Sequence, residues 1–186
     1  MVIMDKVTPE MRRRAKAVNF GIIYGISDFG LSRDIGVSRK EAGQYIASYF
    51  ARYPRVREFI DQMVAAARRT GYVTTMFGRR RYLPDIISKN FNQRSFAERT
   101  AMNTPIQGTA ADIIKKAMID VYRQLEQESL RSRIILQVHD ELVLEVPATE
   151  LTVTGKLVSK AMMEAVSLVV PLIVDISSGV NWATAK

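Results

Sequence analysis

Four side chains between residues 12 and 25 have the types and the spacing that suit a flat, anionic ligand. They recur at intervals of four in the segment RRRAKAVNFGIIYG: Arg12, Lys16, Phe20 and Tyr24. At about 100° per residue, side chains at this spacing share one side of a helix. This side presents two cations, then an aromatic ring, then a phenol, one turn apart each time. A buried face needs no such ordered set, so we predict a ligand-binding face.

The opposite side of the same helix is aliphatic. The residues that fall there on a helical wheel are Ala15, Val18, Ile22 and Ile26. We predict that they face the core, as expected for an amphipathic helix. Arg13 and Arg14 follow Arg12 directly and are consistent with solvated surface charge.

A second candidate site is the segment QVHDELVLEV. Aliphatic residues flank His139, Asp140 and Glu141 on both sides, which places the three polar residues at the tip of a β-hairpin over 134–146. Adjacent carboxylates on stiff strands are natural ligands for a hard divalent cation such as Mg²⁺. A solvated turn explains these residues equally well, and His139 also fits a packing or turn role.

The distribution of charge indicates a polyanionic partner. The 186-residue chain has 27 basic and 19 acidic side chains, a net charge of +8, and 47% hydrophobic residues, which is ample for a core. Residues 1–99 hold 19 of the basic side chains and 9 of the acidic ones. Lysine and arginine bind nucleic-acid phosphates by releasing counterions. We therefore expect nucleic-acid binding, with a general basic surface as the alternative.

Composition excludes some classes of site. The chain has no cysteine, so disulfides and thiolate metal sites are excluded. The first residues, MVIMDKVTPEM, contain no apolar run of signal-peptide length, and the most apolar stretch, AVSLVVPLIV, is too short to cross a bilayer. We expect a soluble, intracellular protein with no membrane partner.

Capping residues and periodicity predict an α+β fold. Thr8 and Pro9 start a helix that ends near Tyr24, where GISDFG breaks it. Further helices are expected at 38–53, 55–71, 92–103, 106–129 and 151–169, with an interruption at Pro105. Hairpins are expected at 72–84 and 134–146, and a last strand at 172–176. We expect a basic helical subdomain at 1–80 and a part with an antiparallel sheet at 81–186.

Taken together, these segments resemble DNA polymerase family A, of the bacterial DNA polymerase I type. RRRAKAVNFGIIYG is similar to the nucleotide-binding helix of that family, with its pattern Arg-x3-Lys-x3-Phe-x3-Tyr-Gly. LQVHDELVLEV is similar to its second catalytic-carboxylate motif, RSFAERTAMNTPIQGTAAD resembles the stretch between them, and GVNWATAK resembles its C-terminus. The resemblance covers residues 8–186. It implies helical fingers at 1–80, with the nucleotide-binding helix at about 9–24, and part of the palm at 81–186.

The resemblance also implies a function. The chain is expected to be the C-terminal part of a DNA-directed DNA polymerase, which transfers deoxynucleotides from dNTPs to a primer 3′-hydroxyl under the direction of a template. The implied partners are dNTP and primer–template DNA, and the implied cofactor is Mg²⁺ in a two-metal site. The implied setting is DNA replication and repair in a bacterial cytoplasm.

Site residues follow from the motifs that match. Arg12 and Lys16 are expected to hold the triphosphate, with Lys16 also catalytic, while Phe20 lies against the sugar and base and Tyr24 guards the templating position. Asp140 is expected to be a metal-binding catalytic aspartate, with Glu141 as a supporting carboxylate. The residues expected to contact the primer–template, largely in the minor groove, are His139, Arg99, Asn103 and Gln107.

Two of these assignments compete with structural explanations. Gln107 follows Thr104 by three residues, with Pro105 between them, which is also a capping-box arrangement. The segment GRRRY at 78–82 fits phosphate contact and a charged hairpin edge about equally.

The sequence departs from the family pattern at its beginning. Only eleven residues precede Arg12, and none resemble the first catalytic-aspartate motif of the family. Two Mg²⁺ ions need bridging carboxylates from both motifs, so we expect the chain alone to be inactive. A non-catalytic nucleic-acid-binding module is the alternative. Loss of the first palm strand is expected to expose a sheet edge beside the 134–146 hairpin, which favours self-association.

Overall fold

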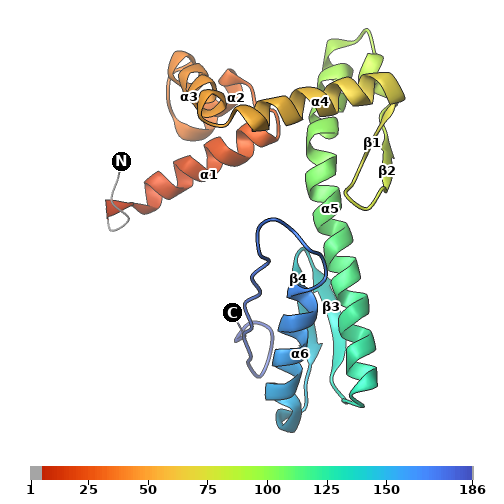
Figure 1. Ribbon diagram of the computed structural model, residues 1–186. Helices are drawn as coiled ribbons and strands as arrows, with labels where there is room; N and C mark the ends of the chain where they lie inside the picture. Colours follow the sequence, from red (N-terminus) through yellow and green to blue (C-terminus); the bar gives the residue numbers. More distant parts are fainter. Residues whose placement is uncertain (1–5, 186) are drawn as a thin grey trace. The chain divides into compact units, whose positions relative to one another are not determined.

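The structure is a computed structural model that describes residues 6–185. The fold is α+β, as the sequence predicts: helices dominate, with two small antiparallel sheets (Figure 1). The chain divides into two compact units, Met1–Ile106 and Gln107–Lys186. The boundary predicted from the sequence, near residue 80, lies before this division at Ile106. The assignment of the two parts to fingers and palm stays a prediction.

The first unit begins with three helices: α1 (Pro9–Ile23), α2 (Asp28–Ile35) and α3 (Arg39–Arg52). The hydroxyl of Thr8 accepts a hydrogen bond from the Met11 backbone N–H at 3.1 Å, and Pro9 occupies the first turn, so α1 starts where the capping signals predict. Ser38 and Glu41 form a reciprocal capping box at α3.

Helix α2 is absent from the sequence-based prediction, which took GISDFG only as a break. Ser27 caps this helix by accepting a hydrogen bond from the Gly30 N–H, and Gly36 ends it in the left-handed conformation, with φ of 68°. The helix buries Leu31 and Ile35 against Ala42 of α3. It was missed because eight residues carry too little periodicity to be recognised without those caps.

The prediction that the aliphatic face of α1 lies against the core is correct only in part. Ile22 is buried, and Val18 packs with α2 and α3. Ala15 is instead exposed, because the face in contact begins one turn later. Ile26 lies beyond the end of the helix, yet the chain folds back so that it still packs against this core.

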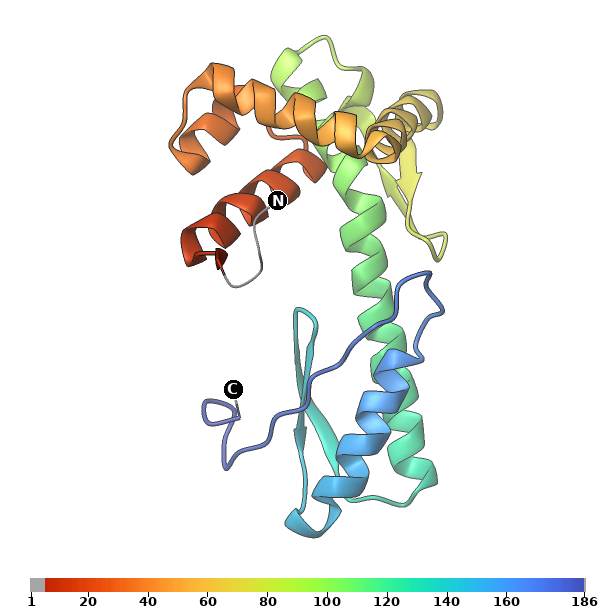
Figure 2. The same cartoon turned by 60° about the vertical axis from the view of Figure 1, so that its left-hand side comes forward.

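The rest of the first unit is built from α4 (Pro54–Thr70), a hairpin of β1 (Tyr72–Thr74) and β2 (Arg80–Tyr82), the 3₁₀ turn η2 (Pro84–Ile87) and the beginning of α5 (Phe91–Gln127). Gly71 ends α4 with φ of 77°, as predicted. The hairpin lies beside α4 and α5 (Figure 2), and one core joins them: Ala67, Val73, Leu83, Ile86, Ala97 and Ala101.

Helix α5 contradicts the interruption predicted at Pro105, since it is continuous over 37 residues with the proline inside. A proline within a helix removes a backbone hydrogen bond and costs about 3 kcal/mol. Burial on both sides offsets that cost, with Ala101 before the proline and Val121 after it. The Thr104 hydroxyl donates to the Thr100 carbonyl at 2.7 Å, so it is not a cap, and the capping box with Gln107 does not form.

The second unit contains the remainder of α5, the hairpin of β3 (Arg133–Val138) and β4 (Glu141–Glu145), η3 (Ala148–Glu150) and α6 (Leu151–Met163). One face of the hairpin packs on α5 and α6 around Val121, Leu125 and Val158. A bulge between Ile134 and Leu136 shifts the register of the hairpin. Glu150 anchors the loop before β3, because it accepts hydrogen bonds from the Ser132 N–H at 2.9 Å and the Ser132 hydroxyl at 2.7 Å.

Two predictions for the last part of the chain are wrong. Helix α6 ends at Met163 rather than near 169, and residues 172–176 form no strand. A strand needs a partner for its backbone groups, and within the described residues the sheets are two-stranded, β1–β2 and β3–β4. Across the same described part, 6–185, the structure contains no helix that is long and apolar enough to cross a membrane.

Candidate nucleotide and nucleic-acid site

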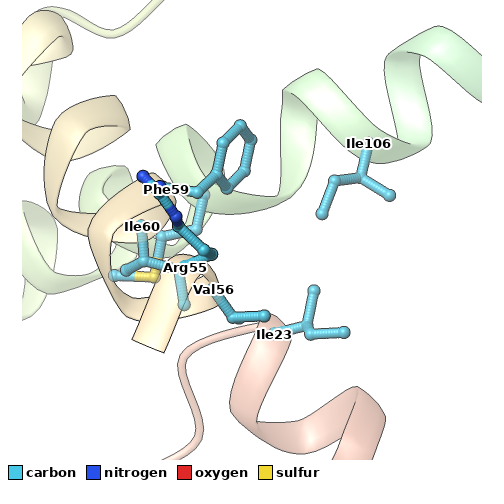
Figure 3. Close-up of a pocket in the computed structure, with 7 residues that line it drawn as sticks. Ile23, Arg55, Val56, Phe59, Ile60 and Ile106 are labelled. Atoms are coloured by element: carbon cyan, nitrogen blue, oxygen red, sulfur yellow. The ribbon is translucent and has the colours of Figure 1, made fainter. Parts of the chain in front are cut away.

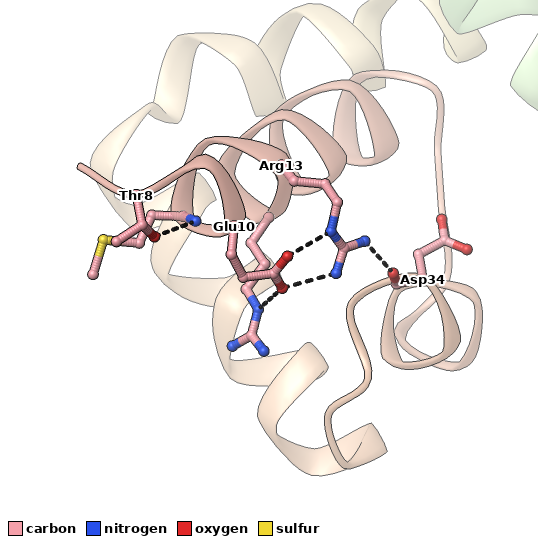
Figure 4. Close-up of polar contacts among 6 residues, drawn as sticks. Thr8, Glu10, Arg13 and Asp34 are labelled. Atoms are coloured by element: carbon pink, nitrogen blue, oxygen red, sulfur yellow. Dashed lines mark hydrogen bonds and ion pairs between the residues drawn. The ribbon is translucent and has the colours of Figure 1, made fainter.

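The cations on α1 divide into two that share an ion pair with Glu10 and two that form none with a described residue. Glu10 accepts hydrogen bonds from the Arg13 guanidinium at 2.8 Å and from Arg14 Nε at 2.8 Å (Figure 4). These hydrogen bonds lower the pKa of Glu10 from 4.5 to about 2. Arg13 also donates to the Asp34 carbonyl at 3.3 Å, which ties α1 to the end of α2. Arg13 and Arg14 are therefore paired surface charges.

Arg12 and Lys16 are the two cations in the second group. Both side chains are exposed, and neither forms a hydrogen bond or an ion pair with another residue in 6–185. Two unpaired cations one turn apart retain their full attraction for an anion. Their availability follows from Glu10, which lies three and four residues before the arginines that it binds. That spacing is visible in the sequence and is the signal that distinguishes the paired cations from the unpaired ones.

The aromatic part of the predicted face is present at the other end of α1. Phe20 is 48% exposed, and its ring centroid lies 6.1 Å from that of Tyr24 at an interplanar angle of 32°. Tyr24 is half-buried and caps the C-terminus of the helix. The structure thus presents an exposed ring next to two free cations, as the spacing predicts.

Gly25 seats the end of α1 against α5. Its φ is +74°, and a Cβ atom there would lie 2.9 Å from Met102 Sδ and 3.2 Å from Arg99 Cγ. Only glycine adopts this conformation without strain and leaves room for such a close approach. This contact brings Tyr24, at the end of the predicted nucleotide face, close to Arg99 of the predicted DNA-contact set.

Arg99 and Asn103 lie on the same stretch of α5 within the first unit. Arg99 is exposed and donates to the Ser95 hydroxyl at 2.8 Å. The Oδ1 atom of Asn103 is buried, and no described residue donates a hydrogen bond to it. A buried acceptor without a donor is destabilising, and such groups in native proteins commonly have a functional reason. Ser95, which accepts this hydrogen bond from Arg99, is not among the residues predicted from the sequence.

An apolar hollow of about 260 Å³ adjoins this region (Figure 3). Its walls come from α1, α4 and α5: Ile23, Arg55, Val56, Phe59, Ile60, Met102 and Ile106. Arg55 is the one charged residue among them, and it is paired with Glu58 at 3.0 Å. The hollow therefore suits an apolar or aromatic group rather than a triphosphate.

The carboxylate hairpin belongs to the second unit. Val138 pairs with Glu141, so His139 and Asp140 form a two-residue turn. His139 has φ of 52°, which is uncommon for a residue with a side chain, and its carbonyl accepts a hydrogen bond from Gln137 Nε2 at 2.7 Å. The side chains of His139, Asp140 and Glu141 are all exposed at this tip.

Some of the predicted site residues belong to the first unit, and the others belong to the second. Arg12, Lys16 and Phe20 lie on α1, Tyr24 is its C-cap, and the Gly25 contact adds Arg99. Gln107 is exposed in the part of α5 that belongs to the second unit, as the carboxylate hairpin also does. Within residues 6–185, no three or more histidine, aspartate or glutamate side chains are grouped so that they could hold a metal ion.

The chain is similar to known proteins over nearly its whole length. A family model described as DNA polymerase family A matches residues 1–184. DNA polymerase I of Bacillus caldotenax is 58% identical over 182 residues, which cover 98% of this chain, and that of Bacillus subtilis (strain 168) is 56% identical over 185 residues. In each case the match covers 21% of the relative, so the chain spans about a fifth of the length of these curated relatives.

A solved structure is also similar. It is the POL domain of Pol1 from M. smegmatis in complex with DNA primer-template and dNTP. It has a TM-score of 0.95 and 47% sequence identity to this chain, and the similarity covers 99% of this chain and 32% of that one.

Proposed function

This chain belongs to DNA polymerase family A, and we propose that it forms the nucleotide-binding part of a DNA-directed DNA polymerase. The proposed reaction is template-dependent: the 3′-oxygen of a primer bonds to the α-phosphorus of a dNTP, and the bond to pyrophosphate breaks. Support comes from the relatives named above and from the free cationic face of α1. The proposed partners are dNTP and primer–template DNA, in replication or repair.

The observation that carries the proposal is the division of charge on α1. Phosphoryl transfer depends on cations that position the phosphates and stabilise the charge that develops on them. Glu10 pairs with both Arg13 and Arg14, so Arg12 and Lys16 are left without an ion pair and are available to the triphosphate. We assign to Lys16 the catalytic role of stabilising negative charge on the reacting phosphates. Phe20, exposed at the next turn, is placed to lie against the sugar and base.

The DNA contacts are proposed for the region where α1 meets α5, and for the second unit. Tyr24 is assigned to the templating position, and Arg99 and Asn103 to the primer–template. Gln107 and His139, both exposed in the second unit, are proposed as further contacts. Minor-groove acceptors look alike in every correct base pair, so contacts there check the shape of a pair without reading its sequence.

The residues present fit only part of a two-metal site. Asp140 and Glu141 supply carboxylates of the kind that Mg²⁺ prefers, but they are exposed at a turn, and the described residues place no third acidic or histidine side chain with them. When bound, Mg²⁺ would supply charge neutralisation at the phosphates. We therefore propose that this chain by itself does not polymerise and that Asp140 contributes part of the site.

Primer extension with Mg²⁺ tests this part of the proposal. The chain and its Asp140→Ala variant are each assayed alone with a primer–template and dNTPs. No extension by either is expected. Extension that is lost in Asp140→Ala would contradict the inactivity and show that further donors complete the site. Such extension would also exclude the alternative, a non-catalytic nucleic-acid-binding module.

Nucleotide binding tests the charge argument without requiring catalysis. Lys16→Ala is expected to weaken binding of a fluorescent dNTP to the chain by about 10- to 150-fold, since one charge-assisted contact contributes about 1.5–3 kcal/mol. Lys40→Ala is the matched control, because Lys40 is exposed in the first turn of α3 and forms no ion pair with a described residue. Equal affinities of the two variants would refute the assignment of Lys16.

Two further features are proposed, the location of the chain in the cell and its self-association. A DNA partner implies a place in the cytoplasm at the nucleoid of a bacterium. The β3–β4 sheet has only two strands within the described residues, so its edges are open to pairing with a second chain. Light scattering at high concentration is expected to detect self-association, and a monomer there would contradict it.

A further inference from the structure

The β1–β2 hairpin carries an exposed aromatic and cationic surface that the proposed nucleotide and metal sites do not use. Its residues share one face: Tyr72, Thr74, Arg80 and Tyr82. The rings of Tyr72 and Tyr82 face each other across the strands, with centroids 5.7 Å apart at an interplanar angle of 61°. The Arg80 guanidinium lies over the Tyr72 ring, 4.7 Å from its centroid. We call this set the hairpin platform.

The platform faces solvent because the other side of the hairpin is anchored. Val73 and Leu83 are 4% and 5% exposed, and both belong to the core shared with α4 and α5. Tyr82, by contrast, is 67% exposed. A large apolar ring on a short, anchored hairpin gains nothing from that exposure in the isolated chain. The anchored hairpin therefore keeps the Tyr82 ring exposed to solvent.

The segment that contains the platform is rich in positive charge. Residues 62–84 contain five arginines and no carboxylate. Glu98 pairs with Arg68, while Arg69 forms no ion pair with a described residue. Arg81 forms none either, but it lies on the opposite face of the hairpin, in register with Val73. The surface thus offers an open ring, a stacked guanidinium and unpaired positive charge within a few residues. Protein ring stacking combined with phosphate-attracting charge is the chemistry that binds single-stranded nucleic acid.

We propose that the hairpin platform binds single-stranded DNA, with an unpaired base on Tyr82 and Arg80 and the backbone phosphates on the neighbouring arginines. Single strands are favoured over duplex because the faces of paired bases are already stacked inside the helix. This site is separate from the cationic face of α1 and needs neither dNTP nor metal. A charged edge that only discourages aggregation would not require an open ring beside the arginines.

Fluorescence anisotropy with the whole chain tests this proposal. A fluorescein-labelled oligodeoxythymidylate is titrated without nucleotide or divalent cation, so a failure of the α1 assignment cannot affect the result. Tyr82→Ala is expected to weaken binding about tenfold, and Tyr82→Phe to retain it, because stacking uses the ring and not the hydroxyl. Arg80→Ala is expected to weaken binding as well, because Arg80 is part of the stack. Arg69→Ala is expected to lower the slope of log affinity against log salt by about 0.7, because its charge is assigned to a phosphate.

The control variant is Tyr45→Ala, which removes another exposed tyrosine, 48% exposed on α3. Circular dichroism confirms that each variant is folded. Affinities that are equal for Tyr82→Ala and Tyr45→Ala would overturn the proposal. Equal competition by a duplex of the same length would also overturn it, because contact with the backbone alone would then account for binding.

Discussion

Replacing Gly25 with alanine is expected to damage both the stability of the first unit and its binding of DNA. Gly25 has φ of +74° and lies where a Cβ would approach Met102 Sδ to 2.9 Å and Arg99 Cγ to 3.2 Å. The substitution therefore imposes two separate costs. One is the strain of a left-handed backbone on a residue with a side chain, and the other is the contact with α5.

The two costs have different sizes. Left-handed backbone costs a residue other than glycine about 1–2 kcal/mol. Overfilling a contact usually costs about 1–3 kcal/mol, and the value here should lie near the lower limit because the thioether of methionine adapts easily. The expected loss for Gly25→Ala is thus about 2–3 kcal/mol in the free energy of unfolding. The displaced Arg99 should also weaken primer–template binding.

Two other glycines separate these costs. Gly36 has φ of +68° with nothing within 4 Å of its added Cβ, so Gly36→Ala reports backbone strain alone, about 1–2 kcal/mol. Gly43 lies inside α3, also with nothing within 4 Å, so Gly43→Ala should stabilise the helix by up to about 1 kcal/mol. Urea unfolding followed by circular dichroism gives all three values. A loss in Gly25→Ala no greater than that in Gly36→Ala, with unchanged DNA affinity, would refute the argument.

Three further predictions concern single contacts. Pro105→Ala should restore a backbone donor inside α5 and raise the free energy of unfolding by up to about 3 kcal/mol in urea melts; a loss of stability would mean that the ring itself packs favourably. Ser132→Ala should cost about 1–3 kcal/mol in the same assay, because Ser132 is 5% exposed and donates to Glu150 at 2.7 Å, and an unchanged midpoint would show that the loop is held by other groups. The pKa of Glu10 is lowered from 4.5 to about 2, so its ion pairs stabilise the chain above pH 4.5, and that contribution is lost as the pH falls towards 2. Glu10→Gln should therefore flatten the dependence of the melting temperature on pH in this window, and an unchanged pH profile would count against the pairing.

Local signals predicted the elements that depend on local chemistry. The hydroxyl of Thr8 and the helix end at Gly71 are each visible in the sequence and each form as expected. Ser38 begins the next helix, as expected, and the structure adds its capping-box partner Glu41. The spacing of Arg12, Lys16 and Phe20 likewise follows from one helix, α1, and Tyr24 is its C-cap; the use of this face for a ligand stays a prediction.

Features that depend on distant residues could not be predicted in the same way. Proline at 105 is a helix breaker by its own chemistry, and only burial in two separate cores shows why the helix continues. Residues 172–176 have the composition of a strand, but a strand exists only with a neighbour, which the described residues do not provide. The approach of Gly25 to Arg99 also joins positions more than seventy residues apart and has no local signature.

The position of the proline within α5 has a consequence for cooperativity. It lies immediately before the division between Ile106 and Gln107, and each unit has its own buried cluster. The helix is weakest where a backbone hydrogen bond is removed, so unwinding that starts in one unit meets its easiest stopping point at this boundary. Partial unfolding of one unit can then leave the other intact, and the chain should melt in two steps rather than one.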